Sequence, residues 1–321
     1  MYDQLKQAIR QTVEAHCSET DFRESIVNAL SRPGYALHLE GPCRAGGLTL
    51  EVYRAIRRTP DEVALQGAAA VELYMQAAYM FDAVADGETR LKSGTPAGEE
   101  LAMAIALMAC GSAAAAEAVC GGGDLAPFLR FQANCVASCA GQSLDASFER
   151  RGSVSTDEAL RMTCLKAGSL GRLAAGFGAG LATRDREAVS LFEDFGFNLM
   201  TYLQLMDDLR DACPSGAPRS DLERGKKTVP LAFFLSSPAT EQTVAPDGIM
   251  RAQEWAQSGT EVRQRFEASG AGIFTALVAE TFLNRAKKDL ADLRLKIGTV
   301  EQLERLLIPL EVSPEEVAAL P

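Results

Sequence analysis

Apolar side chains recur every three to four positions along nearly the whole chain, a spacing that puts them on one face of an α-helix. No stretch alternates apolar and polar residues as a half-buried strand does. Clusters rich in glycine, proline and serine separate the periodic segments, as at 31–34, 41–42, 46–47, 121–123 and 213–216, and Pro238 adds another break. The pattern predicts an all-α fold with helices at 2–15, 20–31, 47–57, 61–85, 98–120, 125–143, 156–165, 167–182, 186–211, 228–236, 247–257, 259–268, 271–296 and 299–307.

The domain organisation follows from the lack of a long polar linker between these helices. A chain of 321 residues with 47% hydrophobic content can bury a large core. We therefore expect one all-helical domain over 1–321, with long helices around a central cavity. Alanine- and glycine-rich runs at 113–116 and 174–182 allow helices to approach closely, or line the cavity with small side chains.

Composition and charge exclude several classes of protein. The formal net charge is -11, which argues against nucleic acid as a partner. The eight cysteines form no CxxC pair, and no further ligand completes a metal site beside Cys135 and Cys139, so we expect small buried residues in a reduced, cytoplasmic protein. With His16 and His38 as the only histidines, both remote from the acidic motifs, a histidine-based mechanism is not expected.

Targeting and membrane segments are not expected. Residues 1–12 are polar and helical, unlike a signal peptide. No run reaches the roughly 18 uninterrupted apolar residues of a membrane span. The nearest, 101–120, is built of small side chains and is predicted to be a tightly packed internal helix.

Two aspartate pairs, Asp82/Asp86 and Asp207/Asp211, carry the chemistry. The i, i+4 spacing puts both carboxylates of a pair on one helix face, and the flanking residues are apolar. Carboxylates on a mostly buried face need partners, because an unpaired buried charge is costly. Two pairs that face each other would form a cage of hard oxygen ligands for Mg²⁺ and a diphosphate. The plainer interpretation is that each pair lies at an ordinary helix end that is exposed to water.

The second cluster is the richer one. Asp207, Asp208 and Asp211 lie within about one helical turn and repel one another unless a cation is present. Lys226 and Lys227 follow within 20 residues. Carboxylates for a metal and lysines for the remaining phosphate oxygens are what a metal-bridged phosphate site needs.

At these residues the chain resembles the trans-isoprenyl diphosphate synthases, the polyprenyl synthetase family. The resemblance runs across roughly residues 25–295, and its most specific parts are the segments 204–211 and 221–231, which are similar to the second aspartate-rich motif and the diphosphate-binding segment after it. Further pieces are Glu72-Leu73 ahead of Asp82, the run 141–145 and the run 166–170.

The resemblance implies an all-helical homodimer that ionises an allylic prenyl diphosphate of about 15 to 20 carbons with Mg²⁺, as three ions held with the diphosphate, before isopentenyl diphosphate attacks the carbocation. It assigns the metal to Asp82 and Asp86 on one side and to Asp207, assisted by neighbouring acids, on the other. It assigns the allylic diphosphate to lysines, and a hydrogen bond to it or to a metal-bound water to a glutamine. The full set is Asp82, Asp86, Asp207, Asp208 and Asp211 for the metal, and Lys166, Lys226, Lys227 (if the register slips) and Gln204 for the diphosphate.

The chain also departs from the family pattern. In the first motif Ala83 replaces the middle acid, while the outer acids, the direct metal ligands of the family, are kept. The segment for the second diphosphate retains Arg44 but lacks a lysine and an arginine, and Arg90 and Lys92 stand for the Arg-Arg after the first motif. Each lost charged contact costs on the order of 1.5–3 kcal/mol, so the acceptor site is expected to be weakened.

The expected floor of the prenyl pocket lies four and five positions before the first motif, at Ala78 and Ala77. Both side chains are small and leave room for a long tail, unless they only pack helices. Tyr74, one turn deeper, can close the pocket again.

Three functions remain open at this point. The first is prenyl transfer to isopentenyl diphosphate or to another acceptor. The second is a class I terpene synthase or cyclase on the same scaffold, which needs no acceptor site, although an aromatic content of 7% gives few ring faces for a cation. The third is a non-catalytic subunit of a prenyl synthase, against which the joint presence of the acidic and basic motifs argues.

Overall fold

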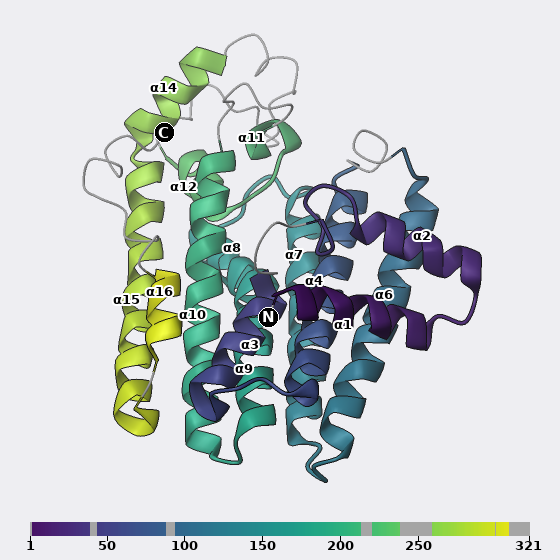
Figure 1. Cartoon of the computed structure of the whole chain (residues 1–321). Coiled ribbons are helices and arrows are strands. Elements are labelled where there is room, and N and C mark those ends of the chain that lie inside the picture. The colour runs from purple at the N-terminus through teal and green to yellow at the C-terminus, as the bar shows by residue number, and fades with distance from the viewer. Residues whose placement is uncertain are drawn as a thin grey trace. The chain divides into compact units, whose positions relative to one another are not determined.

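The computed structural model describes residues 2–38, 44–87, 94–212, 220–237, 259–298 and 300–307, and every regular element in these ranges is a helix, which confirms the all-α prediction (Figure 1). The helices in chain order are α1 Tyr2–His16, α2 Thr20–Leu30, α3 Arg44–Arg57, α4 Glu62–Ala85, α6 Ala97–Cys120, α7 Ala126–Phe148, α8 Thr156–Thr163, the π-helix η1 Cys164–Gly168, α9 Ser169–Ala182, α10 Arg186–Asp211, α11 Asp221–Arg224, α12 Val229–Leu235, α14 Gly259–Ser269, α15 Ala271–Ile297 and α16 Glu301–Leu307.

The chain folds into two compact units. The first comprises residues 1–136, 170–196 and 289–305, and the second comprises 137–169, 197–288 and 306–321. The helices α7, α10 and α15 each contribute residues to both units. The expectation of one domain over 1–321 stays a prediction.

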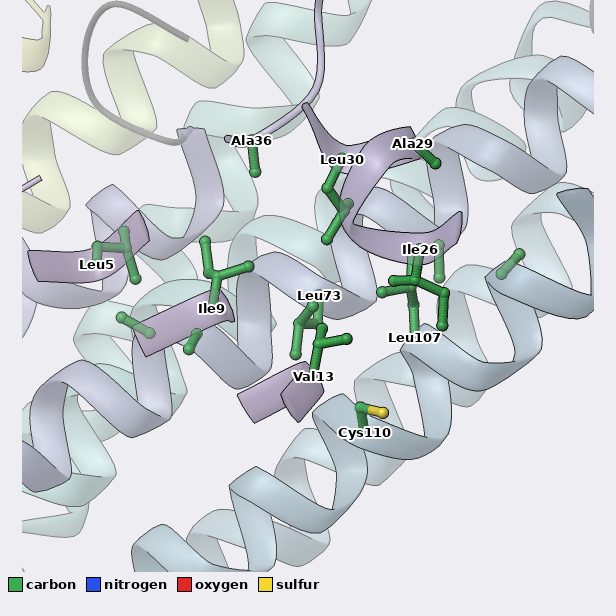
Figure 2. Close-up of a cluster of buried hydrophobic side chains, with 14 of the residues drawn as sticks. Leu5, Ile9, Val13, Ile26, Ala29, Leu30, Ala36, Leu73, Leu107 and Cys110 are labelled. Atoms are coloured by element: carbon green, nitrogen blue, oxygen red, sulfur yellow. The ribbon is translucent and has the colours of Figure 1, made fainter. Parts of the chain in front are cut away.

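The core of the first unit is built around α4, against which α1, α3 and α6 pack. Leucine, isoleucine and valine side chains of α1 and α2 meet Leu73 of α4 and Leu107 of α6 there (Figure 2). Small residues let the backbones approach: a Cβ on Gly111 of α6 would lie 2.8 Å from the carbonyl oxygen of Ala70. Close packing of this kind stabilises the helices more than their individual propensities do.

The prediction of a chain break at Gly46-Gly47 is wrong. Both glycines lie inside α3, which begins at Arg44 rather than at residue 47. The reason is steric, because a Cβ on Gly46 would lie 2.8 Å from the carbonyl oxygen of Ala68 and 3.1 Å from the Cβ of Glu72. Glycine here allows α3 to touch α4, a packing requirement that a local turn signal cannot reveal.

The second unit has its own core of leucine and phenylalanine side chains. Phe234 of α12 meets Phe266 of α14 edge to face at 5.5 Å, and Phe233 stacks on Phe274 at 4.4 Å. The helix α12 also packs against α8, which runs directly into η1.

Two local features of the second unit were not predicted. The helices expected at 156–165 and 167–182 are joined through the π-helical turn η1, and the short helix α11 was missed. The helix α7 also extends to Phe148, five residues past its expected end. The helix expected at 247–257 lies outside the described residues.

Among the described residues, α6 is the single helix that is by itself both long and apolar enough to be a candidate membrane span. By length and composition it could cross a membrane, and the bent pair formed by α14 and α15 passes the same test if it is counted as one span. Half of the apolar window of α6 is buried inside the structure, and α6 packs against α4 and α1. These contacts agree with the expectation that α6 is an internal helix. An internal helix can pass the same test of length and composition as a membrane span.

Candidate active site

The first aspartate pair lies at the C-terminal end of α4, in the first unit. Asp82 is in the last helical turn, and Asp86 follows the helix directly and donates its backbone N–H to the carbonyl oxygen of Asp82 at 2.8 Å. Both side chains are half-buried. The helical register therefore holds two carboxylates four residues apart at a helix end that water can reach.

The second aspartate group occupies the last two turns of α10, in the second unit, and its members differ in environment. Asp207 is half-buried and forms an ion pair with Arg210, while Asp211 is exposed. Asp208 is only 5% exposed and accepts a hydrogen bond from the Gln204 side-chain amide at 2.7 Å. Since adjacent side chains on a helix point about 100° apart, Asp208 faces inward where Asp207 does not.

Asp145 of α7 is the residue on which the two candidate diphosphate-binding lysines converge. Its Oδ2 accepts a hydrogen bond from Lys166 Nζ at 2.7 Å and lies 3.7 Å from Lys226 Nζ. Asp145 is 4% exposed, and its Oδ1 is buried with no hydrogen-bond partner among the described residues. Sequence reasoning quoted this aspartate within the run 141–145 but gave it no role; its spacing of four from Gly141 was the available signal.

Gly141 explains how Asp145 reaches Lys166. A Cβ on Gly141 would lie 2.2 Å from the backbone nitrogen of Lys166, so only glycine permits α7 to approach η1 this closely. Ser138, one turn earlier, donates its hydroxyl to the carbonyl oxygen of Lys166 at 3.2 Å. The three residues 138, 141 and 145 share one helix face, which fixes η1 and its lysine together.

The segment after α11 brings Lys226 to the same carboxylate. Ser220 and Glu223 form a capping box that begins α11, and Gly225 ends it with a left-handed φ of 75°. Lys227 instead donates to the carbonyl oxygen of Gly225 at 2.8 Å, and burial lowers the pKa of this lysine. Lys226 is therefore the better candidate of the two for a phosphate.

The carboxyl groups around these lysines bear the cost of burial. Burial raises the pKa of Asp208 to about 8; the Gln204 hydrogen bond opposes the shift, and the negative charges of Asp221 and Asp145 add to it. Burial raises the pKa of Asp221 to about 7, with Lys226 opposing the shift. More carboxylates gather here than the nearby lysines neutralise, so the group favours an added cation.

These donors fit Mg²⁺ that is shared with a phosphate. Within the described ranges no three carboxylate, imidazole or thiol side chains converge as a complete metal cluster. Magnesium in proteins is commonly held by one or two carboxylates together with water and substrate phosphates. Half-buried Asp207 and exposed Asp211 at the end of α10, together with Asp145, whose buried Oδ1 has no hydrogen-bond partner among the described residues, supply the few carboxylates of that kind of incomplete site.

The remaining predicted residues lie in the first unit or outside the described chain. Arg44 opens α3, whereas Arg90 and Lys92 lie outside the described residues. Ala77 is fully buried within the hydrophobic core, which matches ordinary helix packing. Ala78 is half-buried and shares a helix face with Tyr74 and Asp82, because the three are spaced by four residues.

Comparison with known proteins gives a family match over most of the chain. A model described as polyprenyl synthetase matches residues 35–264. A geranylfarnesyl diphosphate synthase of Natronomonas pharaonis is 35% identical over 121 residues, which is 36% of this chain and 34% of that protein. A geranylgeranyl diphosphate synthase of Mycobacterium tuberculosis is 34% identical over 113 residues, 34% of this chain and 32% of that one. The alignments thus span about a third of the length of these two relatives.

Solved structures share the fold over nearly the whole chain. A geranylgeranyl pyrophosphate synthase from Lactobacillus brevis matches with a TM-score of 0.74 at 17% identity and covers 96% of each chain. A polyprenyl synthetase from Streptomyces coelicolor A3(2) matches with a TM-score of 0.71 at 20% identity, covering 94% of this chain and 96% of its own. At this level of identity the likeness establishes the fold.

The substitution Asp208→Asn tests the buried carboxyl group. Because the pKa of Asp208 is raised from 3.8 to about 8, the folded chain holds a proton that the unfolded chain releases between these values. Stability in EDTA should therefore fall as pH rises through that window, and the substitution removes this contribution. In thermal unfolding, the stability of the variant relative to the wild-type chain should therefore increase from about pH 4 to about pH 8 and then level off. A difference between the two proteins that does not change with pH would contradict this assignment.

Proposed function

We propose that this chain, which belongs to the polyprenyl synthetase family, is a prenyltransferase that ionises an allylic prenyl diphosphate of about 15 to 20 carbons. The prenyl group then passes to isopentenyl diphosphate or to another acceptor. The names of the curated relatives, geranylfarnesyl and geranylgeranyl diphosphate synthase, support this substrate class.

The six cysteines within the described ranges are free thiols, which supports a reducing, cytoplasmic compartment that cell fractionation would test.

The convergence of Lys166 and Lys226 on Asp145 is the observation that carries the proposal. A diphosphate departs only when its developing negative charge is neutralised, and two ammonium groups held within 4 Å of one carboxylate oxygen are placed to do this. Both lysines are fixed by backbone packing around η1 and α11 rather than by flexible surface contacts. The Gln204 side-chain amide, which donates to Asp208, can donate to the diphosphate instead if Asp208 binds a metal ion.

Members of this family generally depend on Mg²⁺, and the donor set accommodates it. We assign three ions to this chain: Asp82 and Asp86 would hold Mg²⁺, as would Asp207, with Asp208 and Asp211 assisting directly or through water. When bound, the metal would neutralise charge on the departing diphosphate. The carboxylates would orient the metal ions. The apolar residues that flank the two aspartate motifs would keep water away from the prenyl carbocation.

The acceptor diphosphate is assigned to Arg44, with Arg90 and Lys92 as further candidates. Arg44 is the first residue of α3. The family's additional lysine and arginine are missing from the sequence around it. Weak binding of isopentenyl diphosphate is therefore expected beside normal binding of the allylic substrate.

Removal of either metal-binding aspartate tests the proposal. Asp82→Ala and Asp207→Ala should each lower Mg²⁺-dependent release of diphosphate from farnesyl or geranylgeranyl diphosphate by about a hundred-fold or more, because each deletes a carboxylate that holds a metal. The assay measures released pyrophosphate and identifies the products by mass spectrometry, with and without isopentenyl diphosphate.

Asp157→Asn, on the exposed first turn of α8, is the matched control and should keep full activity. Full turnover by Asp82→Ala or Asp207→Ala would refute the metal assignment. A hydrocarbon or alcohol made by the wild-type chain without isopentenyl diphosphate would instead identify a terpene synthase.

The prenyl tail is proposed to run along the α4 face that carries Asp82, Ala78 and Tyr74. The eight residues from Asp82 to Tyr74 span about 12 Å of helix. The Tyr74 hydroxyl donates to the carbonyl oxygen of Cys135 at 2.8 Å, and the ring meets Phe131 edge-on, with centroids 6.3 Å apart. Tyr74 is 4% exposed and held by both contacts, so it forms the floor at which the tail ends.

The substitution Ala78→Phe should shorten the product by about one five-carbon unit, because a ring then fills the upper part of this face. Product lengths are measured by mass spectrometry. Ala77→Phe provides the contrast: Ala77 is fully buried in the core, so this variant should lose about 1–3 kcal/mol of stability. If Ala78→Phe leaves product length unchanged, the tail does not follow this face.

A homodimer is proposed through the outer faces of α6 and α7. Ile105 on α6 and Leu129 on α7 are 56% and 62% exposed. The Gln132 side-chain amide donates to the Ser112 hydroxyl at 2.6 Å, which shows that these two faces adjoin. Exposed apolar side chains on adjoining helix faces can mark an interface, and a second copy of the chain is the partner that the family resemblance implies.

The double substitution Ile105→Glu/Leu129→Glu should shift the chain from dimer to monomer, because four charges would then enter the interface of each dimer. Sedimentation velocity measures the change. Leu295→Glu is the control, since Leu295 is 88% exposed and belongs to α15 rather than to α6 or α7. A wild-type chain that sediments as a monomer would refute the proposed dimer.

A further inference from the structure

Two polar residues of α4 are buried where the rest of the helix is apolar. Glu72 and Gln76 are each 1% exposed and lie four residues apart, so they share a helix face. The Gln76 side-chain amide donates to Glu72 Oε1 at 2.6 Å. Buried polar groups of this kind are costly unless they are hydrogen-bonded, so the partners that they meet reveal what they hold.

Their other partners are backbone N–H groups of two residues that come before α4 in the sequence. Glu72 Oε2 accepts the backbone N–H of Gly46 at 2.9 Å. Gln76 Oε1 accepts the backbone N–H of Ala36 at 3.2 Å. The two side chains thus fasten the chain at residue 36 and again at residue 46; we call this four-residue arrangement the α4 clamp.

The α4 clamp acts on the first turn of α3. The Gly46 N–H is one of the amide groups at the helix start that has no partner within the helix, and a carboxylate is favourable there because of the helix dipole. Gly46 has no Cβ, which brings its backbone against Ala68 and Glu72. The position of this turn therefore depends on Glu72 of α4 as well as on the glycine at position 46.

We infer that Glu72 and Gln76 are positioning residues for the acceptor diphosphate: they fix the start of α3 and with it Arg44, two residues before Gly46. Glu72 stands ten residues before Asp82, about 15 Å along α4, so it acts through α3 and not on the reacting atoms. The inference rests on the proposed function for the role of Arg44. The hydrogen bonds of the α4 clamp itself do not depend on that function.

The test compares Gln76→Ala and Glu72→Gln with the wild-type chain. Each removes a hydrogen bond of the α4 clamp, so KM for isopentenyl diphosphate should rise about ten-fold, while KM for the allylic diphosphate stays within about two-fold. Amide hydrogen exchange over residues 44–50 should become faster in both variants. Glu72→Gln is nearly isosteric and keeps the test valid if Gln76→Ala folds poorly.

Gln66→Ala is the matched control, because Gln66 is also on α4 but lies nearer its start and donates its side-chain amide to Glu117 at 2.7 Å instead of to the α4 clamp. It should change neither KM value nor exchange over residues 44–50. Equal rises in both KM values, or faster exchange with unchanged KM values, would overturn the positioning role. If the wild-type chain elongates no substrate, the proposed acceptor is refuted instead, and unchanged exchange in both variants would refute the α4 clamp independently.

Discussion

The meeting of two lysines at one buried carboxylate is the interaction on which the candidate site depends. Asp145 lies in the interior, where an isolated charge would be very unfavourable, and Lys166 and Lys226 offset that cost from two separate segments. The same arrangement holds the ammonium groups in place before any substrate arrives. A diphosphate that enters such a site meets cations whose positions are already determined, so little reorganisation is needed.

Glycine residues make these contacts possible. Gly141 lets α7 touch the backbone of η1, and Gly46 lets α3 touch α4. In both places a single Cβ would collide with a main-chain atom, so the glycine determines which helices are neighbours. Each lies near a residue assigned to a diphosphate: Asp145 with its lysines is one turn beyond Gly141, and Arg44 is two residues before Gly46.

The two proposed diphosphate sites differ in how they are stabilised. At the allylic site, charged side chains meet one another directly, and burial raises the pKa of neighbouring carboxyl groups, which an added cation would favour in the ionised form. At the acceptor site fewer basic side chains are present, and buried polar groups of α4 hold the backbone that carries the remaining arginine. A site with few charged contacts depends more strongly on the geometry of those that remain, because each one then carries a larger share of the binding free energy.

Helical periodicity in the sequence determined the all-α fold and most helix bounds, including both ends of α10. The i, i+4 spacing placed Asp207 with Asp211 and Asp82 with Asp86, since local geometry alone sets that relation. The tertiary structure alone decided that Asp145 joins Lys166 and Lys226, that Ala77 belongs to the core, and that Gly46 lies within a helix. These outcomes depend on residues that are distant in sequence but adjacent in space, and periodicity carries no information about such pairs.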